Sequence, residues 1–73
     1  MLNSEQVKLY IQQGLSCDFV AVQGNDGQHF DAVIVSPEFT GRNIVKQHQL
    51  VYKALGEMMK AEIHALSLDT KEA

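Results

Sequence analysis

Three histidines, His29, His48 and His64, are the side chains of this 73-residue chain whose chemistry is most informative. Neutral imidazole binds borderline metals at neutral pH. His29 stands at the exit of a glycine-containing turn and opens a predicted strand, and His64 lies near the start of another. If these two strands are neighbours, the imidazoles of His29 and His64 approach each other at one edge of a sheet. The alternative for each histidine is an ordinary hydrogen-bonded or solvated side chain.

The other candidates for chemistry, His48 and Cys17, are expected to be structural. His48 falls on the apolar face of a predicted helix, so we expect a packed residue or a part of a partner surface. Cys17 is the only cysteine, and it therefore forms neither an internal disulfide nor a four-thiolate metal site. A small buried hydrophobic residue is the expected role of this thiol. Two histidines alone also fall short of the three or four protein ligands of a zinc site.

The sequence contains no pattern that is typical of an enzyme active site. It has no nucleophile-elbow glycine pattern, no pair of carboxylates within an apolar run and no phosphate-binding loop. Asp26 and Asp31 are interpreted as a turn residue and a strand-surface residue. We therefore expect a protein that acts through a surface or a partner.

The first half of the chain predicts a helix followed by a β-hairpin. Asn3 or Ser4 can cap a helix that runs to about Gln13, with Gln6 completing a capping box and Gly14 closing the helix in a left-handed conformation. Two glycines flank Asn-Asp in the turn that follows, a strong turn signal. The expected antiparallel strands on either side of this turn are Cys17–Val22 and His29–Val35, the second ended by Pro37.

The second half predicts a helix and a third strand. Gly41 allows a sharp reversal and Asn43 is a good N-cap. The helix that follows is expected to have one apolar face, formed by Ile44, His48, Val51 and Leu55. Its opposite face is expected to be polar, with Lys46, Gln49 and Lys53. Gly56 is expected to weaken or bend the helix before Met58 and Met59. The last strand is expected over Ile63–Leu68, with His64, Leu66 and Leu68 on one face.

This order of elements, α-β-β-α-(α)-β, predicts the α+β class, with a three-stranded sheet and helices on one of its faces. Seventy-three residues support one domain, residues 1–73. The formal net charge of −3 works against non-specific binding to nucleic acid. No apolar stretch approaches the roughly 20 residues that span a bilayer. The N-terminal residues lack the basic and apolar regions of a signal peptide, so a cytoplasmic location is expected.

Three segments taken together resemble the BolA family. They are the run Phe39–Tyr52, the run Ile63–Leu68 with its Ile-His-Ala motif, and the turn Gly24–Phe30. The turn histidine and the helix, which has glutamines where basic residues are common, look closer to the YrbA branch than to BolA itself. The resemblance implies a fold similar to a KH domain, and this agrees with the order of elements predicted from the residues.

The resemblance also implies a function. In BolA-like proteins the histidine of the Ile-His-Ala motif is a ligand of a [2Fe–2S] cluster shared with a monothiol glutaredoxin of the Cys-Gly-Phe-Ser type. The matching residue is His64, and the turn ligand, Cys or His in the family, matches His29. The glutaredoxin cysteine and a glutathione thiolate supply the other two ligands. This implies a non-enzymatic adaptor in iron–sulfur cluster trafficking or iron regulation, with negligible cluster in the isolated protein.

The sequence also suggests a partner-binding surface and an alternative function. Arg42, Lys46 and Lys53, together with His48, form the expected partner-binding surface, although a short basic stripe is commonly a solvated helix face. The alternative function is a KH-like nucleic-acid-binding transcriptional regulator, because some family members are linked to transcriptional regulation. The acidic overall charge disfavours it, as does Ile44, which stands where a Gly-x-x-Gly loop needs its second glycine.

Overall fold

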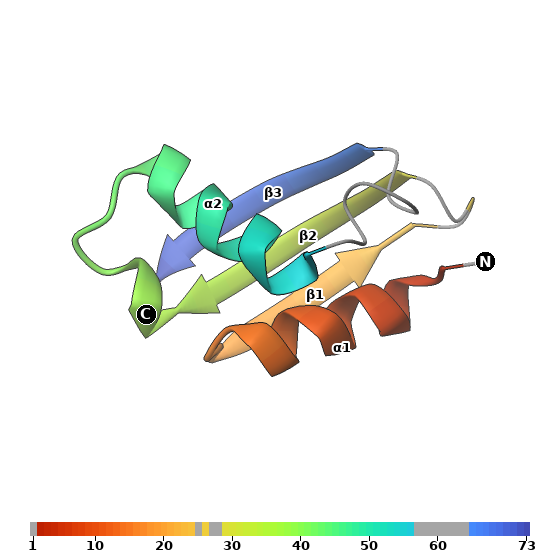
Figure 1. The fold of residues 1–73 in the computed structure, drawn as a ribbon, viewed down its shortest axis with the longest axis horizontal. Coiled ribbons are helices and arrows are strands. Elements are labelled where there is room, and N and C mark those ends of the chain that lie inside the picture. Colours follow the sequence, from red (N-terminus) through yellow and green to blue (C-terminus); the bar gives the residue numbers. More distant parts are fainter. Residues whose placement is uncertain (1, 25, 27–28, 57–64) are drawn as a thin grey trace.

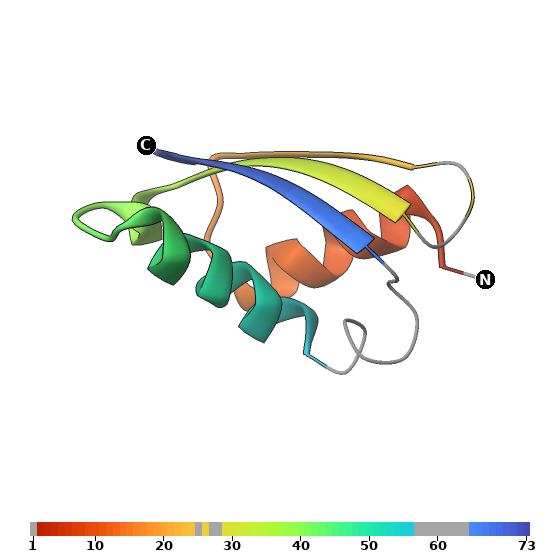
Figure 2. The same cartoon turned by 90° about the horizontal axis from the view of Figure 1, so that it is seen from above.

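The computed structural model describes residues 2–24, 26, 29–56 and 65–73. Its elements follow the chain in the order α1 (Ser4–Gly14), β1 (Phe19–Gln23), β2 (His29–Ser36), the 3-10 turn η1 (Pro37–Phe39), α2 (Ile44–Leu55) and β3 (Ala65–Glu72). Both helices lie against the same face of a three-stranded sheet (Figures 1 and 2). None of the described helices covers the opposite face (Figure 2). The predicted α+β class and the helices on one face are confirmed.

The sheet has the strand order β1-β2-β3 and is mixed. β1 and β2 form the expected antiparallel hairpin, with Phe19 opposite Val35. β2 and β3 are parallel, from His29 opposite Ala65 to Ser36 opposite Glu72. Parallel strands need a long crossover, which here contains α2. Figure 1 shows β2 and β3 side by side, both beginning at the same end of the sheet.

The strands differ from their predicted bounds at the ends. β1 begins at Phe19 instead of Cys17, and β2 continues one residue beyond Val35. β3 continues to Glu72, four residues past the predicted end at Leu68. The polar run after Leu68 has little strand character of its own, but each of these residues is paired with one in β2. Pairing along a whole neighbouring strand thus outweighs local propensity.

The capping box predicted for α1 is confirmed, whereas the predicted role of Gly14 is wrong. The Asn3 side chain accepts a hydrogen bond from the Gln6 backbone at 2.9 Å, and the Gln6 side chain accepts one from the Asn3 backbone at 2.9 Å. Gly14 has no left-handed backbone; among the described residues, the positive-φ glycines are Gly41 and Gly56. A Cβ atom at Gly14 would lie 2.7 Å from the Cβ atom of Ala54. Gly14 therefore lets α1 and α2 pack closely.

The buried face of α2 is rotated from the predicted one. Asn43 caps the helix as expected, accepting from the Lys46 backbone at 2.9 Å. The buried residues are Gln47, Val51 and Leu55, whereas the side chain of Ile44 is 56% exposed. The polar residues Lys46, Gln49 and Lys53 are exposed, as predicted. The helix ends at Leu55, and the residues expected after the bend, Met58 and Met59, lie outside the described part of the chain.

Gln47 is buried with both the nitrogen and the oxygen of its amide hydrogen-bonded. Its Nε2 donates to the Arg42 carbonyl at 2.9 Å, and its Oε1 accepts from the Thr70 hydroxyl at 2.6 Å. The first bond ties α2 to the loop before it, and the second joins α2 to the last residues of β3. A buried polar group is tolerated when it is hydrogen-bonded in this way. Among the described residues, the apolar core consists of Leu2, Val7, Ile11, Leu15, Val20, Phe30, Ala32, Ile34, Phe39, Val51 and Leu55.

Candidate functional site

His29, the predicted turn ligand, is the first residue of β2, and its side chain is 55% exposed. The Asp26 carboxylate contacts His29 through both of its oxygens. One oxygen, Oδ1, accepts a hydrogen bond from the His29 backbone N–H at 2.8 Å, and the other, Oδ2, lies 2.7 Å from the ring nitrogen Nδ1. The first contact is the local side-chain-to-backbone bond that Asp forms in turns. The second fixes the direction of an otherwise exposed imidazole.

The sheet register brings His29 next to the sequence neighbour of His64. His29 is paired with Ala65, the residue that directly follows His64 in the chain. The expectation that the strands beginning near these histidines are neighbours is therefore confirmed. His64 itself lies outside the described residues, as does Ile63, the predicted first residue of that strand. The predicted approach of the two imidazoles stays a prediction.

The four predicted partner-binding residues lie on α2 and the loop before it. Lys46 and Lys53 are exposed and two helical turns apart, so they share one side of the helix. The guanidinium of Arg42 donates from Nε to the Glu38 carbonyl at 2.9 Å. His48 is half-buried, and within the described structure its buried Nε2 atom has no hydrogen-bond partner. His48 therefore belongs to the packed side of the helix more than to its exposed surface.

Arg42 and His29 lie at opposite ends of β2. His29 begins the strand, whereas Arg42 follows its last residue by way of η1 (Figure 1). A strand rises about 3.3 Å per residue, so this strand spans roughly 23 Å. α2 then runs back along the sheet toward the end that carries His29, with Lys53 in its last turn. The structure thus separates Arg42 from the candidate ligand and places Lys53 nearer to it.

α2 also carries an exposed apolar group that was not predicted from the sequence. Ile44, Val45 and Tyr52 have side chains that are 56%, 60% and 40% exposed. They stand among the basic residues of the same helix, which makes this surface both cationic and apolar. The signal was present in the sequence, since a helix with apolar residues around most of its circumference must expose some of them. Their exposure makes α2 a better candidate for a protein contact than its charges alone suggested.

Cys17 lies away from His29 and has a poorly reactive thiol. It precedes β1, at the end of the sheet opposite to His29, and its Sγ donates to the Leu15 carbonyl at 3.3 Å. Burial raises the pKa of the Cys17 thiol, and the nearby carboxylates of Glu38 and Asp18 raise it further. The thiolate is the form that binds metals, so this environment disfavours Cys17 as a ligand. The half-buried side chain packs against the core, as expected.

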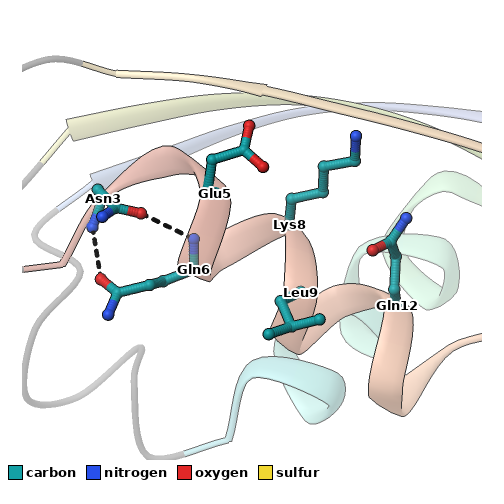
Figure 3. A pocket seen from close by; sticks show the side chains of 6 residues that line it. All are labelled: Asn3, Glu5, Gln6, Lys8, Leu9 and Gln12. Carbon is teal, nitrogen blue, oxygen red and sulfur yellow. Dashed lines mark hydrogen bonds between the residues drawn. The ribbon is translucent and has the colours of Figure 1, made fainter.

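A shallow hollow of about 410 Å³ lies over the outer side of α1 (Figure 3). The described residues that line it are Asn3, Glu5, Gln6, Lys8, Leu9 and Gln12. Asn3 and Gln6 are already engaged with each other in the capping box (Figure 3). None of these side chains is an imidazole or a thiol, so the hollow does not coincide with the predicted ligands.

In residues 2–24, 26, 29–56 and 65–73, no group of three or more His, Cys, Asp or Glu side chains is placed to hold a metal ion. Within the same ranges no helix is long and apolar enough to cross a membrane.

Comparison with known proteins gives matches to one family. The family model described as "BolA-like protein" matches residues 6–73. SufE-like protein 1 of Arabidopsis thaliana, chloroplastic/mitochondrial, is 45% identical over 49 residues, which are 66% of this chain and 13% of that protein. The DNA-binding transcriptional regulator BolA of Escherichia coli K12 is 37% identical over 49 residues, 67% of this chain and 47% of that protein.

A solved structure extends the match to almost the whole chain. The structure of a bolA protein homologue from Coxiella burnetii superposes with a TM-score of 0.88 at 44% identity, covering 99% of this chain and 92% of that one. By contrast, this chain spans less than a third of the first curated relatives that it matches. The family model and the structural match cover nearly every element described above. This chain therefore belongs to the BolA-like protein family.

Proposed function

We propose that this chain is a non-enzymatic adaptor that binds a monothiol glutaredoxin of the Cys-Gly-Phe-Ser type and shares a [2Fe–2S] cluster with it. His29 and His64 are the proposed ligands from this chain, and the glutaredoxin cysteine and a glutathione thiolate are the other two. The observation that carries the proposal is the register at the start of β2. His29, directed by Asp26, is paired there with the residue that follows His64.

The proposed donors suit such a cluster. Imidazole is a good ligand for iron, and histidines replace two cysteines on one iron of Rieske clusters, where they raise the reduction potential. Two imidazoles are too few to hold a [2Fe–2S] cluster firmly, so this function needs the partner's thiolates. A protonated imidazole cannot bind metal, and the shared cluster should therefore dissociate as the pH falls into the range where histidine is protonated.

The exposed side of α2 is the proposed surface for glutaredoxin. Its lysines, Lys46 and Lys53, attract an acidic protein surface or the carboxylates of glutathione, and Tyr52 adds apolar contact area. Arg42 follows the end of β2 opposite to His29, so in this proposal it helps to attract the partner and does not contact the cluster. His48 contributes to α2 packing beneath this surface.

A second candidate is sequence-specific or general DNA binding. The observation in its favour is the match to a relative named as a DNA-binding transcriptional regulator, together with the lysines on α2. The formal net charge of −3 stands against it, because affinity for DNA comes largely from neutralised phosphates. We therefore rank it below the glutaredoxin adaptor.

The test is an anaerobic titration of a cluster-loaded monothiol glutaredoxin with this protein, followed by visible circular dichroism. Wild type is compared with His64→Ala, His29→Ala and the control Lys71→Ala, an exposed change near the far end of β3. We expect a new spectrum that saturates at a one-to-one ratio, is lost in His64→Ala, is weakened in His29→Ala and is unchanged in the control. If the wild-type protein left the spectrum of the cluster-loaded glutaredoxin unchanged, the proposed function would be refuted. Salt-dependent DNA binding would then be measured next.

A further inference from the structure

We propose that Asp26 is a positioning residue that selects Nε2 of His29 as the atom that binds metal. The inference rests on the proposed function and deepens it, since it names both the ligand atom and the group that directs it. The sequence had suggested only a turn residue at Asp26. Its two contacts with His29, one to the backbone and one to the ring, assign it a second role.

The selection follows from the chemistry of the two groups. An ionised carboxylate can only accept hydrogen bonds, so at 2.7 Å from Asp26 Oδ2 the Nδ1 atom of His29 must carry the proton. In a neutral imidazole only one nitrogen is protonated, and the lone pair is then on Nε2. Metal-binding histidines almost always donate the other ring N–H to a carboxylate or carbonyl in this way.

The contact also lowers the entropic cost of binding. The His29 side chain is 55% exposed and that of Asp26 is 51% exposed, so the hydrogen bond between them helps to direct both side chains. The backbone bond from His29 to Oδ1 holds the carboxylate, and the carboxylate in turn holds the ring. A ligand oriented before the metal arrives loses less side-chain freedom when it binds. A group that accepts a hydrogen bond from a metal-binding histidine in this way is typically worth about 10- to 100-fold in metal affinity.

The substitution Asp26→Asn separates this role from a purely structural one. An asparagine keeps the Oδ1 acceptor for the His29 backbone and so preserves the turn. It replaces Oδ2 by an NH₂ group, which is a donor and pairs with an unprotonated Nδ1. The proton then moves to Nε2, and the favoured metal-binding nitrogen is lost. Asp31→Asn is the matched control, because it also removes one carboxylate charge, from the position on β2 two residues after His29.

The first measurement uses the free protein and needs no partner. Long-range ¹H–¹⁵N correlation spectra at about pH 8, where an unperturbed histidine is neutral, report which ring nitrogen of His29 is protonated. We expect Nδ1–H in wild type and in Asp31→Asn, and a shift toward Nε2–H in Asp26→Asn. An Nε2–H tautomer in wild type, or an unchanged tautomer in Asp26→Asn, would overturn the inference.

The second measurement repeats the glutaredoxin titration with the same variants. We expect Asp26→Asn to weaken formation of the shared cluster about 10- to 100-fold relative to Asp31→Asn. Equal behaviour of the two variants, with a normal wild-type spectrum, would refute the positioning role while leaving the proposed function intact. If wild type gave no new spectrum, the proposed function would fail instead, and the tautomer measurement would still decide whether Asp26 directs the ring.

Discussion

Thr70→Val should destabilise the protein markedly although it keeps the volume of the side chain. Thr70 is 8% exposed, and its hydroxyl donates at 2.6 Å to Gln47 Oε1, which is equally buried. Valine offers no donor, so the Gln47 oxygen would remain buried without its partner. Such an unsatisfied group costs about 1–3 kcal/mol. For a domain of this size, each kcal/mol lowers Tm by about 4–8 °C.

The assay is urea unfolding followed by far-UV circular dichroism, with the free energy of unfolding taken from a two-state fit. The control is Thr40→Val, a change of the same type at an exposed position, which should stay within about 0.5 kcal/mol of wild type. The double variant Thr70→Val with Gln47→Leu should recover part of the loss, because both partners of the bond are then apolar. A Thr70→Val protein as stable as Thr40→Val would refute the claim that this bond joins α2 to β3.

Gly14→Ala should lower the free energy of unfolding by about 1–2 kcal/mol in the same assay. The added Cβ would lie 2.7 Å from the Cβ of Ala54, and this strain exceeds the gain in helix propensity. A more stable variant would contradict the close contact between α1 and α2. The Cys17 thiol should react with a disulfide reagent more slowly in the folded than in the urea-unfolded protein, because burial and then nearby carboxylates raise its pKa. Since the folded state binds this proton more tightly, stability should fall as the pH rises above the usual pKa of a thiol, and Cys17→Ser should lack that fall. Lys46→Glu should slow association with glutaredoxin, most strongly at low salt. The control Lys8→Glu, on α1, should slow association less. Equal effects of the two substitutions would argue against α2 as the contact surface.

The candidate site was partly predictable from the residues. His29 was expected at the exit of a turn and at the start of a strand, and both expectations are confirmed. The contact with Asp26 was not predicted, because glycine and asparagine are compatible with several turn conformations, and the sequence does not say where the carboxylate points. Likewise, the exposed surface of Ile44 depended on how α2 is rotated against the sheet. The spacing of the apolar residues alone does not determine the rotation of α2 to within one residue.

The sequence by itself determined the starts of α1 and α2, the end of β2 and the reversal at Gly41. Asn3 and Asn43 cap helices, Pro37 ends β2, and Gly41 turns the chain with a φ of 76°. Each of these depends on hydrogen bonds within three or four residues or on the backbone freedom of a single residue. Such interactions are contained in a short piece of chain, so the residue types are enough to predict them.

The tertiary structure decided the features that need a distant partner. The polar run Asp69–Glu72 is a strand because β2 provides a full ladder for it, and Gly14 is small because α2 crosses there. Gln47 is buried because Thr70, 23 positions later, completes its hydrogen bonds. The pairing of His29 with Ala65 has the same origin, since it depends on the register of two strands that are far apart in the chain. No local pattern contains that register, because the hydrogen bonds that set it join two strands with the whole of α2 between them in the chain.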